Sequence, residues 1–279
     1  MRKDLTKIAL VCTFFLATQL TTYAQNKKYG SLSFNKAVNI SGKQRMLTQR
    51  MGKIYLYLLD NPNDFKAQKN LKITKIIFEK QISILDKNAS LLITKNKLAE
   101  VKDTWEKYKK FIESTPNKKD AEKIINTNST ILKYANNVVN AIILESKGGS
   151  SDDSYVAEED SELKQIINKA GRQRMLSQRL ALYYFANKPD LKNKKTESVL
   201  RNVYSELDNA LNDLLVSSFN NDRIDEALGD VTVLWESVKE NNDKLFKQGY
   251  QDQEIYKLSN TLTKLFNKIT NLYEKVKVE

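Results

Sequence analysis

The stretch NISGKQRMLTQRM, residues 39–51, occurs a second time as NKAGRQRMLSQRL, residues 168–180. Eight of the thirteen positions are identical, and the two copies align at a constant offset without a gap. Trp105 and Trp235 are separated by nearly the same offset, so the repeat extends well beyond this motif. Self-similarity at a fixed offset is the mark of a duplicated structural unit. The sequence therefore predicts two copies of one fold in a single chain.

Composition favours helices for both copies. The 279 residues include only eight glycines and three prolines, too few for the frequent turns of a β-sandwich. Apolar residues recur at helical spacing in eight segments, with Asn61-Pro62-Asn63 and Lys188-Pro189-Asp190 ending the two motif helices at equivalent places. The helices are expected at about 31–60, 64–88, 96–113, 120–146, 158–187, 194–217, 222–246 and 252–276. We predict an all-α fold of two tandem up-down four-helix bundles, at 31–146 and 161–279.

The regions outside the two bundles have compositions of their own. Residues 1–24 begin with basic residues, continue with an apolar run and end in Thr22-Tyr23-Ala24, a pattern typical of a secretory signal peptide. Residues 147–160, rich in Gly and Ser and then acidic, are expected to form a linker. No later stretch approaches the ~20 apolar residues that a membrane span requires. We expect a periplasmic or otherwise extracytoplasmic protein.

Histidine is absent, and the single cysteine, Cys12, lies inside the predicted signal peptide. These absences remove the thiolate nucleophile, the serine–histidine triad and the usual zinc, copper and haem ligands. We therefore expect no cofactor, no metal and no enzyme activity. The formal net charge of +12 is spread over amphipathic helices with acids among the lysines, so we expect solvated helix surfaces and no nucleic-acid partner.

Plotted at 100° per residue, the first motif has two opposite faces. One is apolar and includes Leu47, Met51 and Ile54, which predicts that it faces its own bundle. The other carries Val38, Gly42, Arg45, Gln49 and Gly52 at coiled-coil spacing, and Gly171, Arg174 and Gln178 repeat this seam in the second copy. Because a glycine costs up to ~1 kcal/mol inside a helix, two glycines on one seam predict close approach of another backbone.

The two seams predict a shared binding site. If the motif helices pack against each other, Arg45 and Arg174 come face to face, with Gly42 and Gly171 allowing the approach. Two guanidiniums in a partly dry interface repel each other, and a planar oxyanion that accepts their forked N–H groups would relieve this repulsion. The amides of Asn39, Asn168, Gln49 and Gln178 complete the candidate site, either by binding the anion or by holding the arginines.

Other repeated residues have plainer interpretations, and the arginines themselves have an alternative. Arg45 and Arg174 could instead pair with acids elsewhere, the seam being only packing. Arg50 and Arg179 lie off the seam and could bridge to neighbouring helices. We expect Met46 and Met175 to be packing residues. The two tryptophans are expected to anchor the core of one bundle each.

The motif N-x-[AS]-G-[KR]-Q-R-M-L-[ST]-Q-R-[ML] resembles the signature of the PilJ-type domain, found at the N-terminus of type IV pili methyl-accepting chemotaxis transducers, and the related motif of NarX-like nitrate sensor kinases. The resemblance implies periplasmic four-helix bundles that bind nitrate or similar ligands between the motif helices of two subunits. It also implies that Arg45 and Arg174 contact the anion, with Gly42 and Gly171 giving access. This sequence departs from the family in carrying both motifs in one chain and in showing no membrane spans and no signalling domain.

Two functions follow as hypotheses. The first is an exported sensor or binding protein for a small oxyanion, nitrate or nitrite first and then carboxylates, which reports to an envelope signalling partner. The alternative is a structural or adaptor protein of the cell envelope whose motif seam binds a partner helix. The sequence leaves open whether the two motifs pair within one chain or between two chains.

Overall fold

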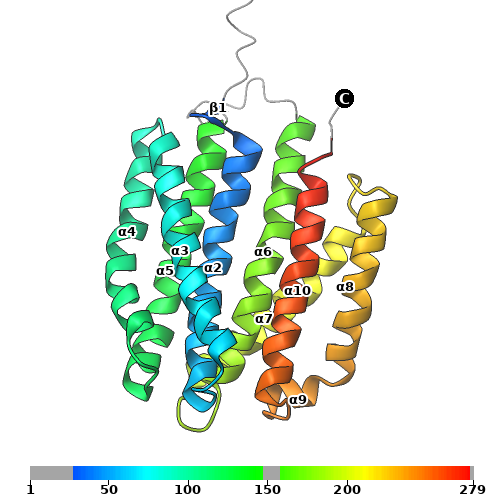
Figure 1. The fold of residues 1–279 in the computed structure, drawn as a ribbon. Coiled ribbons are helices and arrows are strands. Elements are labelled where there is room, and N and C mark those ends of the chain that lie inside the picture. The colour runs from blue at the N-terminus through cyan, green and yellow to red at the C-terminus, as the bar shows by residue number, and fades with distance from the viewer. Residues whose placement is uncertain (1–27, 147–157, 277–279) are drawn as a thin grey trace, which may run out of the picture.

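A computed structural model describes residues 28–146 and 158–276, and within these residues nearly all of the chain is helical (Figure 1). The predicted signal peptide, residues 1–24, lies outside the described residues, as does most of the predicted linker. The helices of the first copy are α2 (Phe34–Asp60), α3 (Phe65–Asn88), α4 (Leu92–Glu113) and α5 (Lys118–Ser146). Those of the second are α6 (Glu158–Ala186), α7 (Lys194–Leu215), α8 (Asp222–Glu240), the short α9 (Asn242–Phe246) and α10 (Asp252–Tyr273). The predicted all-α duplicated bundle is confirmed.

The boundaries follow local chemistry. Ser33 caps α2 by accepting a hydrogen bond from the backbone N–H of Lys36, and the predicted Asn-Pro stop ends the helix at Asp60. The predicted seventh helix is interrupted at Asn241, which separates α8 from α9. The sequence analysis also missed a two-stranded antiparallel hairpin, β1 (Lys28–Tyr29) and β2 (Leu32–Ser33), at the entrance to α2. The side chain of Tyr29 is buried, and its hydroxyl donates a hydrogen bond to the carbonyl of Leu85 at 2.9 Å, which secures the hairpin against α3.

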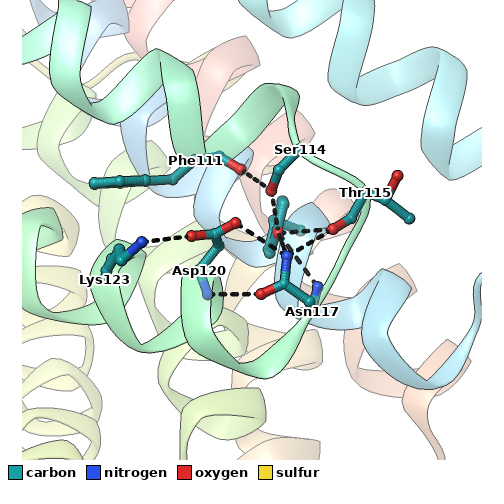
Figure 2. A network of polar contacts seen from close by, with 7 residues as sticks. Phe111, Ser114, Thr115, Asn117, Asp120 and Lys123 are labelled. Atoms are coloured by element: carbon teal, nitrogen blue, oxygen red, sulfur yellow. Dashed lines mark hydrogen bonds and ion pairs between the residues drawn. The ribbon is translucent and has the colours of Figure 1, made fainter.

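The connection between α4 and α5 shows how helix ends are held (Figure 2). The side chain of Asn117 accepts from the backbone N–H of Asp120 at 2.9 Å, and Lys123 pairs with Asp120 at 2.9 Å. The hydroxyl of Tyr55, on the buried side of α2, lies 2.7 Å from the hydroxyl of Ser114. This network joins the connection between α4 and α5 to the motif helix α2.

The two bundles lie side by side, with α2 and α6 adjacent at the centre (Figure 1). The contact between α2 and α6 is the most extensive between any two described elements, and each also packs on the last helix of its own copy, α5 or α10. At one end Lys188 joins the copies through an ion pair to Asp60 at 2.6 Å, and it also pairs with Asp252 of its own copy at 2.7 Å. The buried apolar residues of both copies form one continuous core. The two motif helices are therefore the shared centre of the molecule, and in this structure they pair within one chain.

The tryptophans behave as expected. Trp105 and Trp235 are 3% and 2% exposed, and each indole N–H donates to an acid at an equivalent position, Glu79 at 3.3 Å and Asp208 at 2.9 Å. Each ring therefore anchors the outer half of its own bundle, and the equivalent acids show that the duplication reaches the second helix of each copy.

Candidate functional site

The guanidinium groups of Arg45 and Arg174 meet between α2 and α6. Arg45 is 2% exposed and Arg174 is 1% exposed, which is rare for arginine. A Cβ atom placed on Gly42 would lie 3.4 Å from Nη2 of Arg174 and 3.5 Å from Nη2 of Arg45. Both terminal nitrogens therefore border one small space next to the α-carbon of Gly42. The face-to-face arrangement expected from the seam is present.

Each arginine reaches across to the motif asparagine of the other copy. Nη2 of Arg45 donates to Oδ1 of Asn168 at 2.7 Å, and Nη1 of Arg174 donates to Oδ1 of Asn39 at 2.8 Å. These reciprocal bonds are related by the pseudo-twofold symmetry of the duplication. Asn39 and Asn168 thus hold the arginines, which is one of the two roles expected for them.

A second pair of asparagines completes the network, and the sequence analysis missed it. Nη1 of Arg45 donates to Asn136 on α5 at 2.8 Å, and Nη1 of Arg174 donates to Asn267 on α10 at 3.0 Å. Asn136 and Asn267 are separated by nearly the same offset as the two motifs. The available sequence signal was an asparagine in the C-terminal half of the last helix in both copies.

The pair carries two positive charges and has no carboxylate partner among the residues described. No ion pair joins Arg45 or Arg174 to an acid there, and Nε of Arg45 is buried without a hydrogen-bond partner. Burial lowers the pKa of Arg45, and the positive charges of Arg172 and Arg174 lower it further. Burial also lowers the pKa of Arg174, against the opposing effect of Glu274. The neutral amide oxygens accept from part of the N–H groups and leave the charge uncompensated.

Gly42 and Gly171 make room for arginine side chains, whereas the sequence analysis expected them to admit another helix backbone. The nearest atoms to a Cβ on Gly171 are those of the Arg174 side chain, with Nη2 at 2.9 Å. Gly42 likewise faces two guanidinium nitrogens. Close helix packing occurs instead at Gly52, where a Cβ would lie 2.6 Å from Cδ1 of Leu182 on α6.

The glutamines of the predicted site lie one turn further along and make other contacts. Gln49 is fully buried, and its Oε1 accepts a hydrogen bond from Arg179 at 2.8 Å. Nε2 of Gln178 donates to Thr263 on α10 at 2.6 Å, whereas its Oε1 has no partner. The predicted site residues therefore fall into two groups. The asparagines contact Arg45 and Arg174, whereas the glutamines lie one helical turn away and contact other residues.

The remaining motif residues divide between packing and bridging. Met175 is buried and Met46 is half-buried against the core, as expected for packing residues. Arg179 bridges from α6 to Gln49 on α2 and to Asn128 on α5, each at 2.8 Å, as the bridging interpretation predicts. Arg50 has a different environment, described below.

The described residues contain no group of three or more His, Cys, Asp or Glu side chains that could hold a metal ion. Within the same ranges, no helix is both long and apolar enough to cross a membrane. The chemistry concentrated at the centre of the fold is hydrogen-bond donation and positive charge, which suits recognition of an acceptor.

Two equivalent helical bundles, joined through their motif helices around buried arginines, define the class of this protein: a duplicated helical-bundle protein. The family model PilJ, described as Type IV pili methyl-accepting chemotaxis transducer N-term, matches residues 30–138 and 155–261. The chain therefore belongs to this family and carries its domain twice, as the motif resemblance predicts. No curated protein and no solved structure matches the chain. The family is that of a sensory rather than a catalytic domain.

Proposed function

We propose that this protein is an exported sensor module that binds a small oxyanion, nitrate or nitrite first, between Arg45 and Arg174. The observation that carries the proposal is the pair of buried guanidiniums bordering one space at Gly42, with amide partners and no carboxylate among the residues described. An anion placed there would accept N–H groups from both arginines and compensate both charges. The signal-like residues 1–24 support an extracytoplasmic location, where such an anion would be met.

The same contacts suggest how binding becomes a signal. In the structure, Asn39 and Asn168 each accept from one N–H group of an arginine across the α2–α6 interface. An oxyanion would compete with these amide oxygens, so binding would exchange two direct interhelical bonds for bonds through the ligand. Because α2 and α6 are the main contact between the bundles, the exchange would change how the bundles pack, and a partner protein in the envelope would detect that change.

The adaptor alternative needs a motif seam that is open to a partner helix. Here α6 of the same chain covers the seam of α2, and Val38 and Leu56 on that seam are buried. The observations therefore favour a small ligand over a partner helix.

Isothermal titration calorimetry of the full chain with nitrate, nitrite and short carboxylates tests the proposal. We expect saturable heat from at least one anion and its loss in the double variant Arg45→Gln, Arg174→Gln, which keeps hydrogen-bonding capacity and removes the charge. Circular dichroism spectra would show that the variant is folded. If none of the anions gives heat, or if the double variant binds as tightly as the natural chain, the proposal is wrong.

A further inference from the structure

Arg50 and Arg179 occupy equivalent positions in the two motifs but have different surroundings. Arg179 is satisfied: beyond Gln49 and Asn128, its Nη2 donates to Ser129 at 3.1 Å, and its guanidinium lies 4.6 Å from the ring centre of Tyr183. Nε of Arg50 is buried and has no hydrogen-bond partner, and no carboxylate pairs with this arginine in the described parts of the chain. The duplication has thus kept both arginines but provided partners for one.

Lys53 explains the difference. The offset that equates Asn136 with Asn267 also equates Asn128 and Ser129, which hold Arg179, with Ser259 and Asn260. Nζ of Lys53 takes these two acceptors, at 3.0 Å and 2.8 Å. The position equivalent to Lys53 in the second copy is the apolar Leu182. Lys53 of the first copy therefore occupies the acceptors equivalent to those that Arg179 of the second copy uses.

Neutral groups alone hold the ammonium of Lys53 among the described residues. Lys53 is 0% exposed, and its Nζ lies 4.3 Å from the ring centre of Tyr256. Oδ1 of Asn260 also accepts from Nε2 of Gln178 at 3.3 Å, so one oxygen serves two donors. Burial lowers the pKa of Lys53 strongly, and the charge of Arg50 lowers it further. A buried cation of this kind is costly without a counter-ion.

A groove opens at the surface between α3 and α10, next to two of the residues that hold Lys53, but neither Arg50 nor Lys53 lines it. It has a volume of about 320 Å³, and its lining includes Tyr57, Asn70, Tyr256 and Asn260. Arg50, Lys53 and Tyr57 follow one face of α2 at helical spacing, and Tyr256 and Asn260 are the residues that contact Lys53.

The charged residues that line the groove leave it open to an anion. The carboxylate of Asp64 is engaged, since it accepts from Tyr57 at 2.9 Å and caps α3 at 2.9 Å. Lys66 and Lys257 are the other charged groups of the lining.

We propose that Arg50 and Lys53 form a second anion site, distinct from the Arg45–Arg174 pair, which takes a small organic carboxylate through this groove. The two carboxylate oxygens accept from the guanidinium and the ammonium, which supplies the acceptors that Lys53 has taken from Arg50. The rings of Tyr57 and Tyr256 contact each other, with centres 4.4 Å apart, and line the groove as one aromatic surface for the organic part of the ligand. The site exists in one copy only and does not depend on the function proposed for the first pair.

Acetate and benzoate are suitable probes for calorimetric titration of the full chain. The test is made in the Arg45→Gln, Arg174→Gln background, where the first pair no longer contributes, and again in the otherwise natural chain. Arg50→Gln with Lys53→Met removes both charges of the second site while keeping side-chain length, and methionine suits a position that is apolar in the other copy. We expect this double change to weaken carboxylate binding at least about tenfold in both chains, since two charge-assisted contacts are lost.

The natural chain gives a second readout that needs no altered fold. The Nε–Hε signal of Arg50 in ¹⁵N-arginine spectra, identified by its loss in Arg50→Lys, should shift as acetate is added. Binding that survives Arg50→Gln with Lys53→Met unchanged, an Arg50 signal that does not move, or no carboxylate binding at all would each overturn the second site. If the natural chain binds neither nitrate nor nitrite, and its carboxylate binding depends on Arg50 and Lys53 and not on Arg45 and Arg174, the proposed function is refuted and this site stands.

Discussion

Replacing Gly42 by alanine separates stability from ligand binding at the centre of the molecule. Gly42 lies inside α2, where glycine is about 1 kcal/mol less favourable than alanine. The added methyl would lie 3.4 Å and 3.5 Å from the two Nη2 atoms, which is ordinary van der Waals contact. The ligand-free variant should therefore be as stable as the natural chain or more stable, by up to about 1 kcal/mol.

The same methyl takes the space that the anion needs. It would stand between the Nη2 atoms of Arg45 and Arg174, where an oxyanion would have to accept from both. In the natural chain, a ligand at one hundred times its Kd adds about 2.7 kcal/mol to the free energy of unfolding. For a domain of 150–250 residues this corresponds to roughly 5–10 °C in Tm. In Gly42→Ala we expect little or none of this increment.

Differential scanning calorimetry with and without nitrate measures both effects in one series. Gly229→Ala is the matched control, because Gly229 is exposed on α8 and no atom lies within 4 Å of its added Cβ. The control should gain a similar amount from helix propensity and keep the full nitrate-dependent shift. A Gly42→Ala chain that retains the shift would refute the placement of the anion between the arginines. A chain that loses several kcal/mol without ligand would refute the packing argument.

Three further results are expected. Gly52→Ala should destabilise the chain by about 1–3 kcal/mol, because its methyl would lie 2.6 Å from Leu182, and an unchanged urea midpoint would contradict the close packing seen there. Asn39→Ala should lower the free energy of unfolding without ligand by about 1.5–3 kcal/mol, because Arg174 loses a charge-assisted bond. Nitrate should stabilise this variant more than the natural chain, and equal increases in Tm would argue against competition between the amide and the anion. Lys53→Leu tests a pH effect, because the pKa of this lysine is lower in the folded chain than in the unfolded chain. Between these two pKa values the unfolded chain binds more protons, so the free energy of unfolding of the natural chain should rise with pH across this window. Urea unfolding of the leucine variant should lack this rise, and parallel pH profiles of the two chains would show that the lysine does not titrate differently on folding.

Much of the architecture was readable from the sequence, for local reasons. Helix boundaries at Asp60, Asn88 and Glu113 follow from proline-containing stops and from the 3.6-residue apolar period, which depend only on neighbouring residues. Because the chain is duplicated, the helices predicted for the first copy also predicted those of the second. The same periodicity placed Gly42 and Arg45 on a face opposite the core of their own bundle, and this predicted the meeting of the two arginines.

The interpretation of the glycines failed because periodicity gives the direction of a side chain and not what lies opposite it. A glycine on a seam can admit a backbone or a side chain, and only the structure shows that Gly42 admits two guanidiniums while Gly52 admits Leu182. The break between α8 and α9 at Asn241 was also missed, since no proline or glycine marks it.

The sequence by itself determined that this chain is a tandem helical protein with two equivalent polar seams, because helical period and repetition are properties of the order of residues. Only the tertiary structure decided that the seams pair within one chain and that Asn136 and Asn267 hold the arginines. It also decided that Lys53 takes acceptors from Arg50 through residues on α10. These contacts join positions far apart in the chain, and their geometry depends on how whole helices pack, which no local pattern encodes.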